Sequence, residues 1–219
     1  MDKKKDHSMY SLSEIEKMMK ESPESIVGEA PTHYISGSGM VWYLDPTARN
    51  MKQVMRGTNI VTSPEYVDYK NRVLAYFIDG KIQNLIIKFH GYKIKKEALD
   101  KKDYPKNYPI DINGLTGCLS LINLEIKNIS IYAKESSCED TINFVNVKGT
   151  INEIDIENSF SDGLDIDFSK IEINNIKINS SRNDCVDFSA GEYKINLLDA
   201  KNCGDKALSV GEKSFLYLK

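Results

Sequence analysis

A strict 22-residue repeat between positions 142 and 210 constrains the fold more than any other feature of the sequence. Its clearest element is a triplet with apolar outer residues and a polar middle residue. The four copies are Ile142-Asn143-Phe144, Leu164-Asp165-Ile166, Val186-Asp187-Phe188 and Leu208-Ser209-Val210. The rows Ile151, Ile173, Ile195 and Ile154, Ile176, Leu198 keep the same spacing. A fixed period of this length predicts a stacked fold, in which each repeat buries its apolar side against its neighbours.

The residues within one repeat favour a parallel β-helix over other stacked folds. Twenty-two residues at about 3.3 Å each give a contour of roughly 70 Å, which is enough for three short strands and three bends. A leucine-rich repeat has a similar period, but β-branched residues dominate both halves of the unit here. The sequence therefore predicts a mainly β protein: a right-handed parallel β-helix, or solenoid, with 22-residue coils and a small, partly helical N-terminal cap.

Charge and hydropathy exclude several partners. The 219 residues carry a formal net charge of -3, which gives no general attraction to nucleic acid or to an anionic membrane. No stretch approaches the roughly 20 apolar residues that span a bilayer, and the N-terminus has no apolar run typical of a signal peptide. We therefore expect no nucleic-acid partner, no membrane span, and a cytoplasmic protein unless the chain is a fragment of an exported one.

The cysteines and histidines suggest no metal site. The four cysteines form no C-x-x-C pair and occupy different phases of the repeat, which favours buried, reduced thiols over disulfides or metal ligands. They are Cys118, Cys138, Cys185 and Cys203. The three histidines are scattered along the chain, so no zinc site is expected.

Residues 1–72 differ from the rest and are expected to form the partly helical cap. A capping box at Ser11-Leu12-Ser13-Glu14 predicts one short helix, and Ser63-Pro64 predicts another. Asp45-Pro46 predicts a third, whose apolar face includes Met55 and which ends at Gly57.

Residues 73–219 are expected to form the β-helix. Apolar residues alternate with a period of two from Val73, with turns expected at Asp79-Gly80 and Asn84. A lysine-rich segment with two prolines, residues 93–117, is expected to be a loop that interrupts the coils. The last strand, Phe215–Leu218, lies one period beyond residues 193–196, so we expect the terminal coil to continue in a longer chain or to pack on a partner.

Two rows of acidic side chains are the strongest candidates for function. Alternation places Asp165 and Asp167 outward, and Asp165 stacks on Asp187 of the next coil about 5 Å away. Carboxylates at that separation repel, and the arrangement suits a calcium site, an acid/base pair or a plain exposed stack. A second row lies at the preceding bend, where aspartates often bond to the backbone. It comprises Asp140, Asp162 and Asp184.

Three short motifs stand at the bends with the spacing of the repeat. They are Ser161-Asp162-Gly163, Asn183-Asp184-Cys185 and the run 205–211, which begins Asp205-Lys206. In order and spacing they resemble the polygalacturonases, pectin-degrading enzymes whose successive coils carry N-T-D, D-D-C and G-H-G-L-S-I-G. The resemblance covers residues 161–211 and implies the pectin-lyase-like fold.

The polygalacturonase mechanism implied by this resemblance is inverting hydrolysis, in which one carboxyl protonates the glycosidic oxygen and others activate water. Asp162 and Asp184 match two of the three catalytic aspartates. Asn183 replaces the proton donor, Lys206 replaces the histidine, and the final R-I-K motif would lie beyond Lys219. Because an amide cannot act as a general acid at neutral pH, hydrolysis by this route is not expected.

Three classes of function remain open. The leading hypothesis is a carbohydrate-directed module of a bacterial polysaccharide-processing protein, which binds an acidic glycan along the outward ladder and requires no cofactor. The alternatives are an active polysaccharide hydrolase, lyase or epimerase of this fold, and a structural spacer or assembly module.

Candidate catalytic residues are Asp162, Asp165, Asp184, Asp187 and Lys206. Candidate substrate-binding residues are Arg182, Asn183, Asp167 and Glu212, with Tyr132, Tyr193 or Tyr217 as flanking aromatics. Asp165 and Asp187 are the candidate ligands of a calcium ion.

Overall fold

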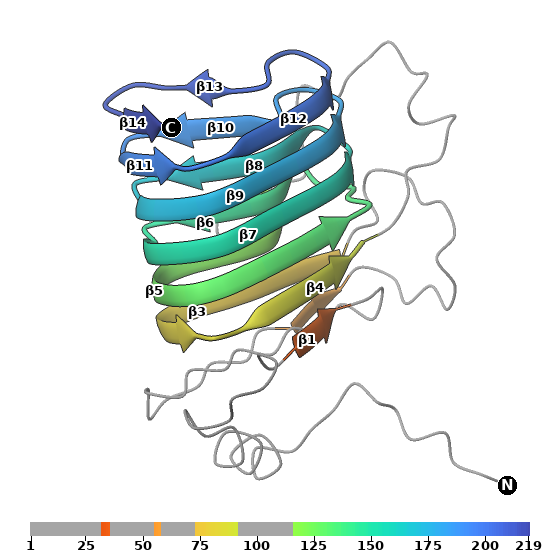
Figure 1. Cartoon of the computed structure of the whole chain (residues 1–219). Coiled ribbons are helices and arrows are strands. Elements are labelled where there is room, and N and C mark those ends of the chain that lie inside the picture. Colours follow the sequence, from red (N-terminus) through yellow and green to blue (C-terminus); the bar gives the residue numbers. More distant parts are fainter. Residues whose placement is uncertain (1–31, 36–54, 58–72, 92–115) are drawn as a thin grey trace, which may run out of the picture.

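The computed structural model describes residues 32–35, 55–57, 73–91 and 116–219 (Figure 1). They form a parallel β-solenoid, in which each turn of the chain pairs with the turn before it. Its strands are β1 (Thr32–Ile35), β2 (Met55–Gly57), β3 (Val73–Gln83), β4 (Ile86–His90), β5 (Gly117–Lys134), β6 (Asp140–Val145), β7 (Lys148–Ser159), β8 (Asp162–Asp167), β9 (Lys170–Ser181), β10 (Val186–Ser189), β11 (Glu192–Ile195), β12 (Leu198–Cys203), β13 (Ser209–Val210) and β14 (Phe215–Leu218). Within these ranges no helix is long and apolar enough to cross a bilayer.

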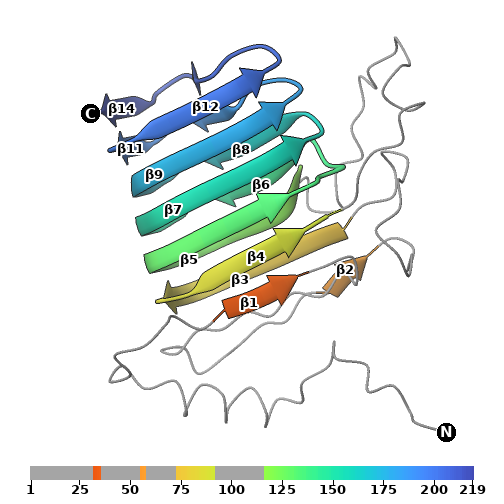
Figure 2. The same cartoon turned by 45° about the vertical axis from the view of Figure 1, so that its right-hand side comes forward.

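Two walls of stacked strands enclose the core (Figure 2). The rear wall consists of β6, β8, β10 and β13 with the first part of β5. The front wall consists of β4, β12 and the last parts of β5, β7 and β9, while β11 and β14 stack on the first parts of β7 and β9. The front strands run to the right as the chain rises and the rear strands return to the left (Figure 1). The solenoid is therefore right-handed, as predicted.

The 22-residue register predicted from the sequence is confirmed. Ile142, Leu164 and Val186 are direct partners in β6, β8 and β10, and each is 0% exposed. The row of Ile151 and Ile173 continues to the third isoleucine in β11, again buried. Because parallel pairing places equal phases above one another, the apolar positions of every coil form one continuous core.

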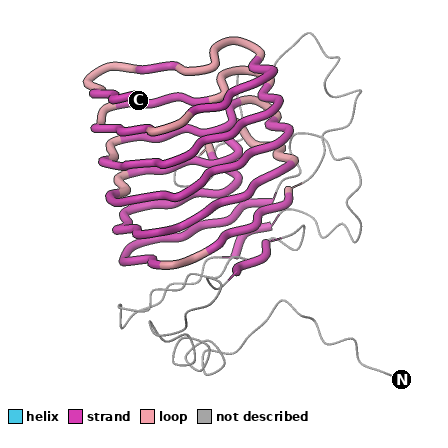
Figure 3. The backbone as a smooth tube through the Cα atoms, in the orientation of Figure 1, coloured by secondary structure: helices cyan, strands magenta, loops and turns pink. Residues whose placement is uncertain are grey.

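The bends between strands also stack, so loops are confined to the corners of the solenoid (Figure 3). Several corner residues adopt positive φ, a conformation that asparagine tolerates better than most residues. Among them, Asn158 and Asn202 have φ of 59° and 55°. The amide of Asn202 donates to the side chain of Asn179 over 2.8 Å, which links one coil to the next.

Some of the predicted elements differ from the structure. No turn interrupts β3 at Asp79-Gly80; the strand continues, with Gly80 at φ 121°, which glycine adopts without a steric penalty. Residue 117 opens β5 instead of closing the lysine-rich loop. The expected helix after Asp45-Pro46 is wrong over Met55–Gly57, which form β2, antiparallel to β3. The other expected helices lie outside the described residues.

The register of the terminal coil is also shifted by one residue from the prediction. Leu216 pairs with Tyr193, and Leu218 pairs with Ile195, so the last repeat spans 23 residues. The additional residue lies in the bend before β14, where Lys213 has a φ of 59°. Phe215 therefore points outward and is 65% exposed.

The cysteines form two disulfides, so the prediction of reduced thiols is wrong. Cys118 bonds to Cys138 and Cys185 bonds to Cys203, with a Cα separation of 5.4 Å in both. Each pair joins the beginning of a rear strand to the end of the same coil. The repeat pattern did not predict this pairing, because cysteines 18 or 20 residues apart come into contact only when the coil closes.

Small side chains occupy the equivalent positions of the two intervening coils. In one coil the hydroxyl of Thr141 lies 2.7 Å from that of Ser136 and 2.8 Å from that of Ser159. In the next, a Cβ added to Gly163 would lie 3.0 Å from the hydroxyl of Ser181. We name this stack, together with the two disulfides, the closing corner. Because small side chains in the intervening coils occupy the same positions as the cysteines, we expect that these coils can also accept a disulfide at the closing corner.

Replacing Thr141 and Ser159 together by cysteine should create a third disulfide, because their hydroxyls already touch and their spacing equals that of Cys185 and Cys203. Closing a loop of this size stabilises a protein by about 3 kcal/mol in the chain-entropy model, less the lost hydroxyl bonds. Thiol titration and thermal unfolding with and without reductant test this. The single variant Thr141→Cys is the control, and two thiols that stay free under oxidising conditions would contradict the prediction.

Candidate functional site

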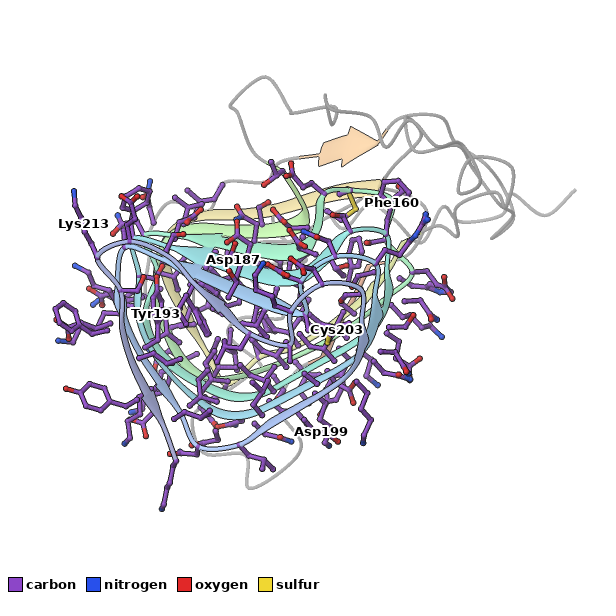
Figure 4. The ribbon with its side chains drawn as sticks, turned by 90° about the horizontal axis from the view of Figure 1, so that it is seen from above. Phe160, Asp187, Tyr193, Asp199, Cys203 and Lys213 are labelled. Carbon is purple, nitrogen blue, oxygen red and sulfur yellow. A yellow bond between two sulfur atoms is a disulfide. The ribbon has the colours of Figure 1, made fainter. Side chains whose placement is uncertain are left out.

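The outward ladder of the rear wall, the middle residues of the four repeated triplets, exists as predicted, and one further residue, Ser120, precedes it. Asp165 of β8 pairs with Asn143 on one side and with Asp187 on the other. Ser120 extends the ladder downward through β5, and Ser209 extends it upward through β13. Figure 4 shows Asp187 on the outer side of the wall. The structure therefore brings two of the candidate catalytic carboxyls, Asp165 and Asp187, directly next to each other.

Burial changes along the ladder. Ser120 and Asn143 are 0% and 2% exposed, whereas Asp165, Asp187 and Asp167 are half-buried. The amide of Asn143 donates to Asp165 Oδ2 over 3.0 Å. The part of the ladder that a ligand can reach is therefore the carboxyl group of three aspartates on β8 and β10.

Burial changes the protonation of these carboxyls. It is the largest cause that raises the pKa of Asp165 to about 8, followed by the charges of Asp167 and Asp187, while the Asn143 hydrogen bond opposes the shift. Burial and the Asp187 charge raise the pKa of Asp167 as well. At neutral pH Asp165 is therefore protonated and can donate a hydrogen bond as well as accept one.

The second acidic row, at the bend, ties coils together. Asp162 Oδ1 accepts the backbone N–H of Asp184 over 2.8 Å, and Asp184 Oδ1 accepts that of Lys206 over 2.8 Å. In the coil below, the hydroxyl of Thr116 is hydrogen-bonded to Asp140, which is 3% exposed and whose pKa is raised by burial. Two of the candidate catalytic residues, Asp162 and Asp184, are thus engaged by the backbone of the next coil.

Asp162 still differs from an ordinary bend aspartate in its titration. Burial raises its pKa to about 6, although the Asp184 N–H and the Asn183 side chain both stabilise its charged form. Lys206 is held between two carboxylates, 3.3 Å from Asp184 and 2.6 Å from Asp205. Its positive charge is therefore largely compensated at the bend.

The remaining candidate residues do not converge on the ladder. The Arg182 guanidinium lies 5.8 Å from the centre of the Phe160 ring, and Asn183 hydrogen-bonds to Asp162, so both belong to the bend. Glu212 is exposed, and its carbonyl accepts the N–H of Ala190 at the opposite end of the rear wall.

The expectation that tyrosines flank the acidic face is wrong. Tyr193 lies inside the solenoid (Figure 4), 2% exposed, where its hydroxyl donates to the carbonyl oxygens of Ile166 and Ser189. Tyr132 lies on the front wall, and Tyr217 is 71% exposed on β14. None of these three tyrosines therefore lies on the outer face of the rear wall.

The front wall carries a polar cluster around Glu153 that was not predicted from the sequence. Glu153 accepts hydrogen bonds from Tyr132 over 2.8 Å, from Asn175 over 3.0 Å and from Lys177 over 2.8 Å. The Lys177 hydrogen bond is the largest cause that lowers the pKa of Glu153. The 22-residue spacing of Glu153 and Asn175 indicates that the two residues are neighbours in adjacent coils, and it could have predicted their contact. The cluster fixes the charge of Glu153 and is internally paired.

No protein metal centre is formed in the part of the chain that the structure describes, because no three His, Cys, Asp or Glu side chains gather as metal ligands. A calcium ion at Asp165 and Asp187 would have two carboxyl groups from the protein. Since calcium takes six to eight oxygen ligands, a glycan or water would have to supply the rest.

The chain matches no protein-family model, and the comparisons with curated proteins and with solved structures return no similar chain. The fold is therefore established by the strand pairing, and the resemblance to polygalacturonases is confined to the bend motifs. In those motifs the structure gives Asp162 and Asp184 a coil-linking role.

Removing the Asp184 carboxyl should destabilise the fold. Asp184→Ala leaves the Lys206 N–H without its acceptor at a site where the Asp184 side chain is 6% exposed, which costs about 1–3 kcal/mol. Asp184→Asn keeps the accepting oxygen and should cost less. Urea unfolding measures both. Asp205→Ala, at an exposed carboxylate, is the control, and an equal loss for all three variants would contradict the assignment.

Stability should fall as the pH rises because of Asp165. Its pKa is about 8 in the folded chain, against an ordinary 3.8. Between these two pKa values the folded state binds more protons than the unfolded state, so the free energy of unfolding decreases as the pH rises and levels off above about pH 8. Asp165→Asn should flatten this dependence and add about 1 kcal/mol above pH 8, after allowance for partial exposure. Thermal unfolding across the pH range tests it, with Asp199→Asn on the front wall as control. A profile parallel to that of the unmodified chain would refute the assignment.

Proposed function

We propose that this solenoid is a carbohydrate-directed module that binds a glycan along the rear wall, across Asp165, Asp167 and Asp187. The observation that carries the proposal is the row of half-buried outward carboxyls that repeats from one coil to the next. Adjacent coils lie about 4.8 Å apart, a step comparable to the length of one sugar unit in an extended polysaccharide.

The chemistry of the row suits sugar hydroxyls. A carboxylate accepts hydrogen bonds from neighbouring hydroxyls, and a protonated Asp165 adds a donor. The proton of Asp165 also lowers the negative charge of the ladder, which supports an acidic, uronate-rich glycan as ligand. A calcium ion between the Asp165 and Asp187 carboxyls would lower it further. The parent protein that we propose is a bacterial polysaccharide-processing protein of the pectin-lyase-like group.

A catalytic role is the second candidate, favoured by one specific observation. Carboxyls with pKa values of about 6 and about 8, those of Asp162 and Asp165, lie near each other on adjacent parts of β8. Perturbed carboxyls often mark acid/base sites, and a carboxyl that stays protonated at neutral pH can serve as a general acid for a hydrolase, lyase or epimerase. The bonds from Asp162 and Asp184 to the next coil favour instead a structural module.

Retention of the chain by a panel of neutral and uronate polysaccharides, with and without calcium, tests the proposal. We expect retention by at least one polymer, and an at least tenfold weaker affinity after Asp165→Ala combined with Asp187→Ala, because these changes remove the side-chain oxygens that sugar hydroxyls or calcium would contact. For a uronate polymer, affinity should also fall above about pH 8, as Asp165 loses its proton. The front-wall pair Asp199→Ala with Asp155→Ala is the matched control.

New reducing or unsaturated ends in the same incubations would show catalysis. Retention that survives the Asp165 and Asp187 changes would place the binding surface elsewhere. No retention and no new ends with any polymer would refute both the binding and the catalytic proposals.

A further inference from the structure

The corner that follows the acidic strand β8 carries an exposed aromatic ring. Phe168 lies between β8 and β9, directly after Asp167 of the rear wall. Strict alternation along β8 would turn its side chain into the core, beside Leu164 and Ile166. Instead Phe168 is 66% exposed, and the next residue, Ser169, is buried. The backbone φ of Phe168 is 51°, so the chain turns at this residue and the alternation of the strand ends there.

This corner position is unfavourable for a phenylalanine. The equivalent residue one coil below, Asn146, has a φ of 54°, and asparagine tolerates this left-handed conformation far better than a bulky aromatic residue does. The ring also gains little from packing, since its equivalents in the two adjacent coils, Asn146 and Ala190, are small. Backbone strain of this kind is often found at functional sites. The exposed ring therefore needs an explanation other than the stability of its coil.

Hydrogen bonds to both adjacent coils fix the backbone of this corner. The Phe168 N–H donates to the carbonyl of Ser189, one coil above, over 3.1 Å. The Asp167 carbonyl accepts the N–H of Asn146, one coil below, over 3.0 Å. It also accepts the hydroxyl of Ser169 over 2.7 Å. Because the backbone is fixed and the ring turns about only two side-chain bonds, a ligand that covers Phe168 orders few additional degrees of freedom.

The exposed ring lies at the end of a row of carboxyls. Asp165 and Asp167 face outward from β8, and Phe168 lies within about 10 Å of Asp165 along the chain, at about 3.3 Å per residue. Carboxyls bind the hydroxyl groups at the edge of a pyranose ring, whereas the C–H face of the same ring is apolar and packs against an aromatic side chain. The corner therefore supplies the apolar contact that the acidic ladder lacks.

We propose that Phe168 is the aromatic platform of the glycan site, on which the C–H face of one pyranose unit stacks while Asp165 and Asp167 bind the hydroxyls of a neighbouring unit. This assignment rests on the proposed glycan function and makes it more specific. The ligand has to present an apolar pyranose face at the corner between β8 and β9, in addition to hydroxyls along the rear wall.

The affinity of Phe168 variants for polygalacturonate, alginate, hyaluronate and dextran tests the platform. Phe168→Ala should bind every polymer that retains the unmodified chain about tenfold more weakly, because the stacking contact is lost. Phe168→Tyr keeps an aromatic ring and should bind as the unmodified chain does. Leu197→Ala removes another exposed apolar side chain, 56% exposed between β11 and β12, and should leave the affinity unchanged.

The variant Phe168→Asn separates binding from folding. Asparagine relieves the strain of the left-handed conformation, so this variant should unfold at a higher urea concentration than the unmodified chain and yet bind about tenfold more weakly. Damage to the fold would lower stability and affinity together. Phe168→Trp places a fluorescent ring at the corner, whose emission should change when a retaining polymer is added. The unmodified chain, which has a single tryptophan at another position, is the control.

The outcomes distinguish the platform from the glycan proposal on which it rests. Unchanged affinity of Phe168→Ala and Phe168→Asn for a polymer that retains the unmodified chain would overturn the platform alone, as would equal losses for Phe168→Ala and Leu197→Ala. Weak binding by Phe168→Ala with full binding by Asp165→Ala combined with Asp187→Ala would support the platform and refute the ladder. No retention of the unmodified chain by any polymer would refute both.

Discussion

Parallel hydrogen bonding between successive coils is the constraint on which the rest of the structure depends. It places equal positions of the repeat above one another, so one inward isoleucine or leucine per coil becomes a continuous buried row. The same pairing forces outward aspartates into contact. Asp165 and Asp187 are neighbours because Leu164 and Val186 are neighbours, so the energetics of the core set the electrostatics of the surface.

The closing corner and the acidic bend meet a second demand of a solenoid, which is that the turns of each coil must also be held. Small polar groups and disulfides do this inside the corner, and the carboxyls of Asp162 and Asp184 do it at the bend. Backbone N–H groups at bends need acceptors, and a carboxylate one coil below supplies them. Residues that resemble catalytic aspartates in sequence can therefore have a structural role, while the ladder beside them stays accessible.

Sequence reasoning recovered the elements that depend on periodicity. The coil length, the inward rows and the pairing of Asp165 with Asp187 follow from 22-residue spacing, and the structure confirms them. The predictions were wrong at two places where a single residue changes the register of a strand or lets a strand continue. The bend at Lys213 holds an additional residue, which turns Phe215 outward, and β3 passes through Asp79-Gly80 because a glycine permits the local conformation.

The sequence by itself determined the solenoid and its outward ladder, because alternation and a fixed period are local properties that stacking simply copies from coil to coil. Only the tertiary structure decided which cysteines meet, which tyrosine is buried and which carboxyl keeps its proton. Those outcomes depend on distances across the closed coil and on burial from neighbouring coils. Cys185 meets Cys203, and Asp165 has a pKa of about 8, because of contacts that exist only after the chain has coiled.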